Sequence, residues 1–286
     1  MGLHKLKAPL TFQGGKQRVA DKIVEIIGLD DDCSLVDLCC GSGAVSISAV
    51  NNGMHPCNIT MVDKSEWGGF WEMVSNSRFD TKKFLSFIDE IPNDPNDIQN
   101  YLKYKTTEDF SVWEYDELVL LWLILQAGSF GGKHIWLEDN KWRNASFRNY
   151  WLPTATSSRR SPVNPMMPMP NTLKNQVLDI VHHMSPVKAY HGDVKDFDFE
   201  YYDTKIRNKE RVVLFLDPPY EGTTGYGHSF DYKYWIKSLD LPKGYELWIT
   251  EYKPLSEKHY LLSKTSKGGI SGSKDKVNTE ILSRIF

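Results

Sequence analysis

Apolar residues, the first two of them β-branched, run without interruption from Val212 to Leu216 and stop at an acid, two prolines and a tyrosine. A short continuous apolar run predicts a strand that is buried on both faces, as in the middle of a parallel sheet. Pro218 and Pro219 have no N–H to donate and therefore end the strand. The pattern places Asp217 at the carboxyl end of a core strand, where open α/β sheets bind their ligands.

Two further strands with similar endings lie nearer the amino terminus. Residues 34–50 predict a short strand that ends near Asp37, then a glycine turn over Gly41–Gly43 and a helix of small residues. Ile59–Asp63 predicts a second strand that again ends in an acid, roughly 20 residues after the glycines, where a carboxylate commonly accepts hydrogen bonds from a ribose. The turn lacks the third glycine of a dinucleotide motif, because Ser46 stands there. A cofactor site at the turn and a purely geometric use of glycine both remain open.

The remaining pattern predicts helices and a closing hairpin around an interrupted βα alternation. Helices are predicted over Gln17–Ile27, Asp80–Ile91, Tyr115–Gln126 and Thr172–Met184, and strands over Glu246–Tyr252, Tyr260–Lys264 and Glu280–Phe286. Ala189–Phe199 predicts a strand that ends at Asp193 and then a turn. The alternation breaks from about Glu66 to Lys174. We therefore expect an α/β domain formed by residues 1–70 and 172–286, with an inserted helical and loop-rich region over residues 71–171.

A stretch between residues 127 and 160 mixes basic with aromatic side chains. The basic residues, taken as candidate contacts to DNA, are Lys133, His134, Lys141, Arg143, Arg148, Arg159 and Arg160. Aromatic residues such as Trp136 and Trp142 stand between them. The mixture suits phosphate contacts combined with stacking on bases. A β-hairpin with a tryptophan core and a solvated face fits the same residues, so both interpretations stay open.

The segment FQGGK at residues 12–16 precedes the first predicted helix. Gly14 and Gly15 would let the backbone approach a ligand closely, with Lys16 near the helix start. Taken by itself, a flexible turn with a solvated lysine is the simpler interpretation.

Composition narrows the class of protein without changing this picture. The 286 residues carry a formal net charge of −3, which gives no overall attraction to nucleic acid, so any such partner must meet a local patch. The four cysteines have neither the density of a disulfide scaffold nor the spacing of a zinc site. No signal-peptide core is present, and the longest apolar run, Leu118–Leu125, is too short to cross a bilayer. We expect a soluble cytoplasmic protein that uses no membrane and no metal.

The motifs together resemble the Dam-type DNA adenine-N6 methyltransferases, a family with many phage-encoded members. The matching segments follow the family's order: FQGGK, DLCCGSG at 37–43, Asp63, DPPY at 217–220, TTGYG at 223–227, TEY at 250–252 and EILSRIF at 280–286. The resemblance implies a Rossmann-like S-adenosylmethionine-dependent methyltransferase sheet with a terminal antiparallel hairpin and an inserted target-recognition domain. It also implies double-stranded DNA as the partner of a monomer or weak dimer.

The resemblance also assigns roles to single residues. The catalytic group would be Asp217, Pro218, Pro219, Tyr220 and Lys16. The site of the cofactor, S-adenosylmethionine, would comprise Phe12, Gly14, Gly15, Lys16, Asp37, Cys39, Gly41, Ser42, Gly43, Asp63, Asp193, Val194 and Asp217. Within it, Asp63 would take the ribose hydroxyls, and Asp193 with Val194 would border the adenine ring.

The chemistry of the DPPY tetrad supports the same reaction independently. The exocyclic nitrogen of adenine is a poor nucleophile, because its lone pair is delocalised into the ring. The carboxylate of Asp217 and the carbonyl of Pro218 would accept hydrogen bonds from its two N–H groups and turn the lone pair toward an electrophilic methyl group. The two prolines hold that carbonyl stiffly in place. Tyr220 offers a face on which an extruded base can stack, worth about 1–3 kcal/mol.

Two departures from the family pattern and several alternatives remain. Leu38 and Cys39 stand where relatives carry Pro-Phe, and residues 129–132 differ from the usual recognition segment, so no target sequence is implied. A related tetrad would serve cytosine-N4 methylation, and a catalytically silent DNA-binding relative would keep the same motifs. The plain structural interpretation of DPPY is a proline-rich turn, which would have to coincide with three other strand-end motifs.

Overall fold

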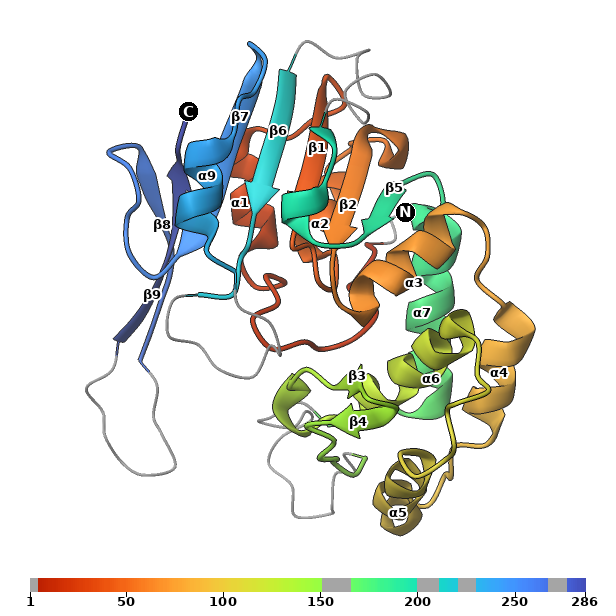
Figure 1. Cartoon of the computed structure of the whole chain (residues 1–286). Helices are drawn as coiled ribbons and strands as arrows, with labels where there is room; N and C mark the ends of the chain where they lie inside the picture. Colours follow the sequence, from red (N-terminus) through yellow and green to blue (C-terminus); the bar gives the residue numbers. More distant parts are fainter. Residues whose placement is uncertain (1–4, 151–165, 200–210, 221–229, 267–276) are drawn as a thin grey trace.

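A computed structural model describes residues 5–150, 166–199, 211–220, 230–266 and 277–286. Within these residues, seven strands form one sheet in the order β5–β2–β1–β6–β7–β9–β8 (Figure 1). The strands are β1 (Cys33–Leu38), β2 (Ile59–Asp63), β5 (Lys188–His191), β6 (Arg211–Leu216), β7 (Tyr245–Glu251), β8 (His259–Ser266) and β9 (Val277–Arg284). The protein is thus a mixed α/β protein with a large central sheet.

Five of these strands are parallel and two are not. β5, β2, β1, β6 and β7 pair in parallel, whereas β9 pairs antiparallel with both β7 and β8. The predicted core strands and the predicted terminal antiparallel hairpin are therefore confirmed. The arrangement is compatible with a Rossmann-like fold.

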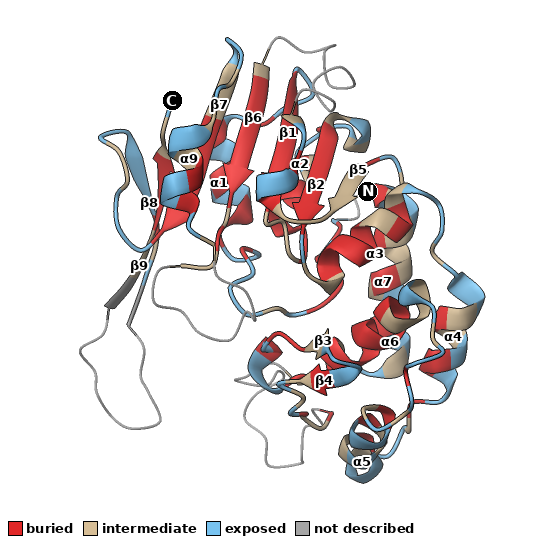
Figure 2. Cartoon of the chain, in the orientation of Figure 1, coloured by how far each residue is buried: buried red, intermediate tan, exposed pale blue. Residues whose placement is uncertain are grey.

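Strand β6 is buried on both faces, as its unbroken apolar run predicts (Figure 2). Val213 and Phe215 pack into one hydrophobic cluster, together with Ile23 of α1 (Ala20–Ile27). Leu214 packs into a second cluster, together with Trp235 of α9 (Tyr232–Ser238). Helices thus cover both faces of the sheet, and the core lies in two layers on either side of it.

The other helices flank the sheet or belong to the inserted region. They are α2 (Ala44–Asn51), α3 (Glu66–Ser75), α4 (Thr81–Asp89), α5 (Pro95–Lys105), α6 (Tyr115–Ala127) and α7 (Pro170–Met184). The predictions of α4, α6 and α7 are confirmed, whereas α3, α5 and α9 were not predicted. The boundary placed between residues 70 and 71 lies inside α3. The helix predicted from Gln17 begins at Ala20, because residues 17–19 form turns.

The inserted region lies beyond the carboxyl ends of the parallel strands (Figure 1). Its helix α6 is apolar on all sides and is buried accordingly. A two-stranded hairpin follows, formed by β3 (Trp136–Glu138) and β4 (Lys141–Arg143). Its two turn residues, Asp139 and Asn140, both have positive φ, 50° and 55°, as a tight hairpin turn requires. The region therefore faces the edge of the sheet at which ligands are expected.

No helix in the part of the chain that the structure describes combines the length and the apolar character needed to cross a membrane.

Candidate functional site

The carboxyl ends of β1 and β6 meet where the chain reverses its direction across the sheet. From β1 the chain moves outward through β2 to β5, and it then returns to β6 on the other side of β1. Open α/β sheets bind ligands at such a switch point. A cavity of about 390 Å³ lies there, between Asp37 of β1 and Asp217 directly after β6. Its size falls within the usual range for small-molecule sites.

Most of the predicted site residues line this one cavity. They are Phe12, Gly14, Gly15, Lys16, Asp37, Cys39, Gly41, Ser42, Asp63, Asp193, Val194, Asp217, Pro218, Pro219 and Tyr220. The structure thus brings together segments that lie up to 208 positions apart in the sequence, from Phe12 to Tyr220. Gly43 is the one predicted cofactor residue that does not line the cavity.

The glycine turn between β1 and α2 has a backbone that other residues rarely adopt. Gly41 and Gly43 have φ angles of 50° and 70°. A Cβ atom on Gly43 would lie 2.5 Å from the Trp71 ring and 2.6 Å from Met61, so glycine there serves close packing. Cys39 also adopts a positive φ, 58°, a conformation that costs a non-glycine residue about 1–3 kcal/mol. The cavity wall therefore contains one strained non-glycine position, Cys39.

Asp63 fixes the turn to the end of β2. One carboxylate oxygen accepts a hydrogen bond from the Gly41 N–H at 2.8 Å. The other accepts from the backbone N–H and the hydroxyl of Ser65, at 2.8 and 2.6 Å. The side chain is buried and lines the cavity. A carboxylate offers about four lone-pair positions, so Asp63 can accept further hydrogen bonds from a ligand.

Asp217 is held from one side by Lys16 and Thr250. Its Oδ1 atom lies 2.6 Å from Lys16 Nζ and accepts a hydrogen bond from the Thr250 hydroxyl at 2.5 Å. Its Oδ2 atom has no hydrogen-bond partner among the described residues. Lys16 is 6% exposed, so the interpretation of a solvated lysine is wrong. The arrangement leaves one carboxylate oxygen available to a ligand N–H.

Lys16 also contacts a second carboxylate, Glu280 of β9. The two groups are 3.3 Å apart, and the Tyr220 hydroxyl donates to the same Glu280 oxygen at 3.1 Å. Burial by itself would lower the pKa of Lys16, but Asp217 and Glu280 together raise it above its usual value. Burial raises the pKa of Asp217, although Lys16 and Thr250 oppose that shift. The lysine is therefore a permanent cation between two acids.

Asp37 is a buried acid without a cationic partner among the described residues. Its carboxylate accepts a hydrogen bond from the Ser46 hydroxyl at 2.6 Å. Burial raises its pKa to about 7, and the charge of Asp217 contributes to that shift. Asp37 consequently changes charge near neutral pH, inside the cavity wall.

Replacement of Asp37 by asparagine is expected to change how stability depends on pH. The folded pKa of about 7 lies above the unfolded value of about 3.9, so the wild-type protein loses stability as pH rises from about 4 to about 7. The free energy of unfolding of wild type should fall relative to that of Asp37→Asn by about 1.4 kcal/mol per pH unit in that window. Urea unfolding at pH 5 and pH 8 measures the difference. Parallel pH curves for the two proteins would show that Asp37 is ionised throughout.

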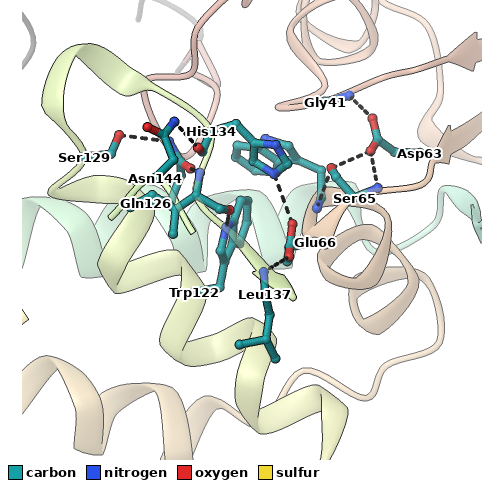
Figure 3. Close-up of polar contacts among 12 residues, drawn as sticks. Gly41, Asp63, Ser65, Glu66, Trp122, Gln126, Ser129, His134, Leu137 and Asn144 are labelled. Atoms are coloured by element: carbon teal, nitrogen blue, oxygen red, sulfur yellow. Dashed lines mark hydrogen bonds and ion pairs between the residues drawn. The ribbon is translucent and has the colours of Figure 1, made fainter. Parts of the chain in front are cut away.

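Glu66, the first residue of α3, connects this edge of the sheet to the inserted region (Figure 3). One of its oxygens lies 3.0 Å from His134 Nε2, and the other accepts from the Leu137 backbone N–H at 2.9 Å. Its neighbour Ser65 bonds Asp63 as described above. The hydrogen bonds from the glycine turn to Ser65 and those from Glu66 to the inserted region are therefore joined by the single peptide bond between Ser65 and Glu66.

The basic residues taken as DNA contacts are placed in different environments. Lys133 and Lys141 are exposed. His134 is buried, bonded to Glu66, and lines the cavity, so it does not belong to an exposed basic surface. Arg143 lies 2.9 Å from the Glu138 carboxylate, and Arg148 lies 3.6 Å from the centre of the Phe130 ring. Among the described residues of this group, Lys133 and Lys141 are the two exposed cations.

Two parts of the predicted site lie outside the described residues. They are Arg159 and Arg160, and the TTGYG segment at 223–227.

Three further residues belong to the site, although no motif assigned them individually. Thr250 lies within TEY and Glu280 opens EILSRIF, so both segments were noted without a role for these side chains. Glu66 carried no signal, because only Trp67 separates it from two glycines, which are typical of a loop. Contacts across the fold, and not local patterns, define all three.

Neither a protein-family model nor a curated protein matches this chain in sequence. The function must therefore be inferred from the geometry and charge of the cavity.

Proposed function

We propose that the protein transfers a methyl group from S-adenosylmethionine to the N6 amino group of an adenine extruded from duplex DNA. One observation carries the proposal: the DPPY tetrad and the glycine turn, far apart in sequence, line a single cavity at the switch point of the sheet. A cofactor bound at the turn would therefore lie beside any group that Asp217 holds. Such proximity is the main requirement of an in-line transfer.

The charge of the cavity supports a cationic cofactor. Its described lining contains five acids, Asp37, Asp63, Asp193, Asp217 and Glu280, against two lysines, Lys16 and Lys64. S-adenosylmethionine carries a sulfonium, an ammonium and a carboxylate, and is thus a net cation. An excess of carboxylates favours that charge and disfavours a phosphate in the cavity. The residues present therefore suit this cofactor, whose reactive methyl group supplies the chemistry.

The free oxygen of Asp217 supports binding of an amino group. Lys16 and Thr250 occupy Oδ1, which leaves Oδ2 for one N–H of the base, while the Pro218 carbonyl would accept from the other. Tyr220 is oriented by its hydrogen bond to Glu280 and by Tyr252, whose ring centre is 4.6 Å away. Stacking on Tyr220 would offset part of the few kcal/mol that base extrusion costs.

Isotope-labelled S-adenosylmethionine and duplex DNA test the proposal directly. After incubation with the protein, nucleoside mass spectrometry should detect labelled N6-methyladenine. Labelled N4-methylcytosine would assign the site to cytosine, and cofactor and DNA binding without any label would identify a silent DNA-binding protein. Either result would overturn the proposal.

Replacing Lys133 and Lys141 together by alanine should weaken DNA binding. Each lysine that contacts a phosphate contributes about 0.9 to the slope of log affinity against log salt, so the slope should decrease by about 1–2. Fluorescence anisotropy at several salt concentrations measures it. The control is the pair Lys237→Ala and Lys243→Ala, which are also exposed but lie near the amino end of β7. If both pairs of substitutions changed the salt dependence of DNA binding equally, Lys133 and Lys141 would not belong to the DNA-binding surface.

A further inference from the structure

Glu280 is a second acid in contact with the ammonium group of Lys16. The proposed hydrogen bonds from the base to Asp217 and to the Pro218 carbonyl do not require it. Lys16 Nζ lies 2.6 Å from Asp217 Oδ1 and 3.3 Å from Glu280 Oε1. The Tyr220 hydroxyl and the Ser263 hydroxyl donate to the two oxygens of Glu280 at 3.1 and 3.3 Å. Three side chains from distant segments, those of Lys16, Tyr220 and Ser263, therefore converge on this carboxylate.

Methyl transfer to an amino group creates a proton that must leave the site. The sulfonium loses its positive charge, and the product nitrogen gains it together with a surplus N–H. Asp217 is the carboxylate proposed to touch that nitrogen, and the Lys16 side chain next to it is 6% exposed. Glu280, on the other end of the same ammonium, is 23% exposed. Asp217 itself is 18% exposed, so the three groups form a short path that passes through a buried ammonium and ends at its most exposed group, Glu280.

We propose, on the basis of the methyl transfer proposed above, that Glu280 is a relay residue that receives the surplus proton through Lys16. The methylated nitrogen gives one proton to Asp217 Oδ2, and a half-turn of the carboxyl group then brings that O–H to Lys16 Nζ. Asp217 passes a proton to Lys16 as Lys16 donates one of its own to Glu280 Oε1, so that the lysine stays an ammonium and Asp217 returns to its anionic form. Glu280 then loses the proton to water. No bond other than N–H and O–H changes, and no further reactant is needed.

A purely structural role of Glu280 predicts a different kinetic result. If Glu280 only orients Lys16 and Tyr220, its loss disturbs the base before the methyl group moves and slows the first turnover. If it receives the proton, the first transfer proceeds and the following turnovers are delayed. First-turnover and steady-state rates therefore separate the two roles.

The test uses the full chain, duplex DNA and labelled S-adenosylmethionine. In Glu280→Gln the amide oxygen still accepts the hydrogen bond from Tyr220 but takes up no proton. The single-turnover rate should stay within about threefold of wild type, while kcat falls at least about a hundredfold, at the low end of what a general base contributes. The decrease in kcat should become smaller as pH rises, because hydroxide then accepts the proton in place of the carboxylate. Glu257→Gln, an exposed glutamate between β7 and β8, is the matched control and should change neither rate.

Chemical rescue provides a second readout. In Glu280→Ala, added formate should restore part of the lost kcat, because a small carboxylate can occupy the vacated place. An unchanged kcat in Glu280→Gln, an equally slow first turnover, or the absence of rescue by both pH and formate would overturn the relay. Wild-type protein without any methyl transfer to DNA would overturn the proposed function itself, so the two failures are distinguishable.

Discussion

Asp217→Asn is expected to lower the single-turnover rate of methyl transfer by at least about a hundredfold, which is the usual cost of losing one preorganised polar contact to a reacting group. The amide can keep its oxygen toward Lys16 and Thr250, which hold Oδ1 in the wild-type protein. Its NH2 group then takes the place of Oδ2. Since the amino group of the base is also a hydrogen-bond donor, the two groups cannot form a hydrogen bond. The expected loss therefore arises in the transfer step and not in cofactor binding.

Single-turnover methylation and calorimetric titration of the cofactor measure the two quantities separately. Asp240→Asn is the control, since Asp240 is an exposed aspartate between α9 and β7. Circular dichroism and the melting temperature establish that the variant is folded. A near-normal transfer rate in folded Asp217→Asn would remove this carboxylate from the proposed mechanism.

Lys16→Met is expected to destabilise the folded protein by about 3–5 kcal/mol, the usual effect of removing one partner of a buried ion pair. Asp217 and Glu280 would then face each other without the cation that both contact. Since burial already raises the pKa of Asp217, the variant can relieve the repulsion by binding a proton. The destabilisation should therefore be smaller at pH 5 than at pH 8.

Urea unfolding of wild type and Lys16→Met at both pH values checks this expectation. Lys82→Met is the matched control, because Lys82 is an exposed lysine on α4. Its free energy of unfolding should stay within about 0.5 kcal/mol of wild type, as for most surface substitutions. If Lys16→Met lost the same free energy of unfolding at both pH values, Asp217 and Glu280 would not take up protons in this variant.

The sheet could be predicted from the sequence because its signals are local. The apolar run of β6 and the acids at the ends of β1 and β2 each occupy a few neighbouring residues. Helix α3 was missed because Gly68 and Gly69 are typical of a loop. In the structure these glycines permit close contact instead: a Cβ atom would lie 2.1 Å from the Asp63 carbonyl oxygen and 2.8 Å from Tyr115, respectively.

The partners within the site could not be predicted, because they meet only after folding. Thr250 is 33 positions from Asp217, and Glu280 is 60 positions from Tyr220. Periodicity carries no information about such pairs. The sequence also left the surroundings of the basic and aromatic residues open. In the structure Trp142 is buried, as the interpretation of a tryptophan core predicts, while Lys133 and Lys141 are exposed. Contact with DNA remains a prediction for these lysines.

The contacts of Ser65 with Asp63 and of Glu66 with the hairpin would make ligand binding in the cavity and at the hairpin depend on each other. Glu66 begins α3 immediately after Ser65, which bonds Asp63, and its carboxylate holds the backbone of β3 at Leu137. A ligand that draws Asp63 away from Ser65 changes the start of α3 and with it the hairpin. Linkage is reciprocal, so occupancy of the hairpin alters affinity in the cavity by the same factor as the reverse. Through Glu66, the binding of a ligand in the cavity would thus change the affinity of the hairpin for its own ligand, and the reverse.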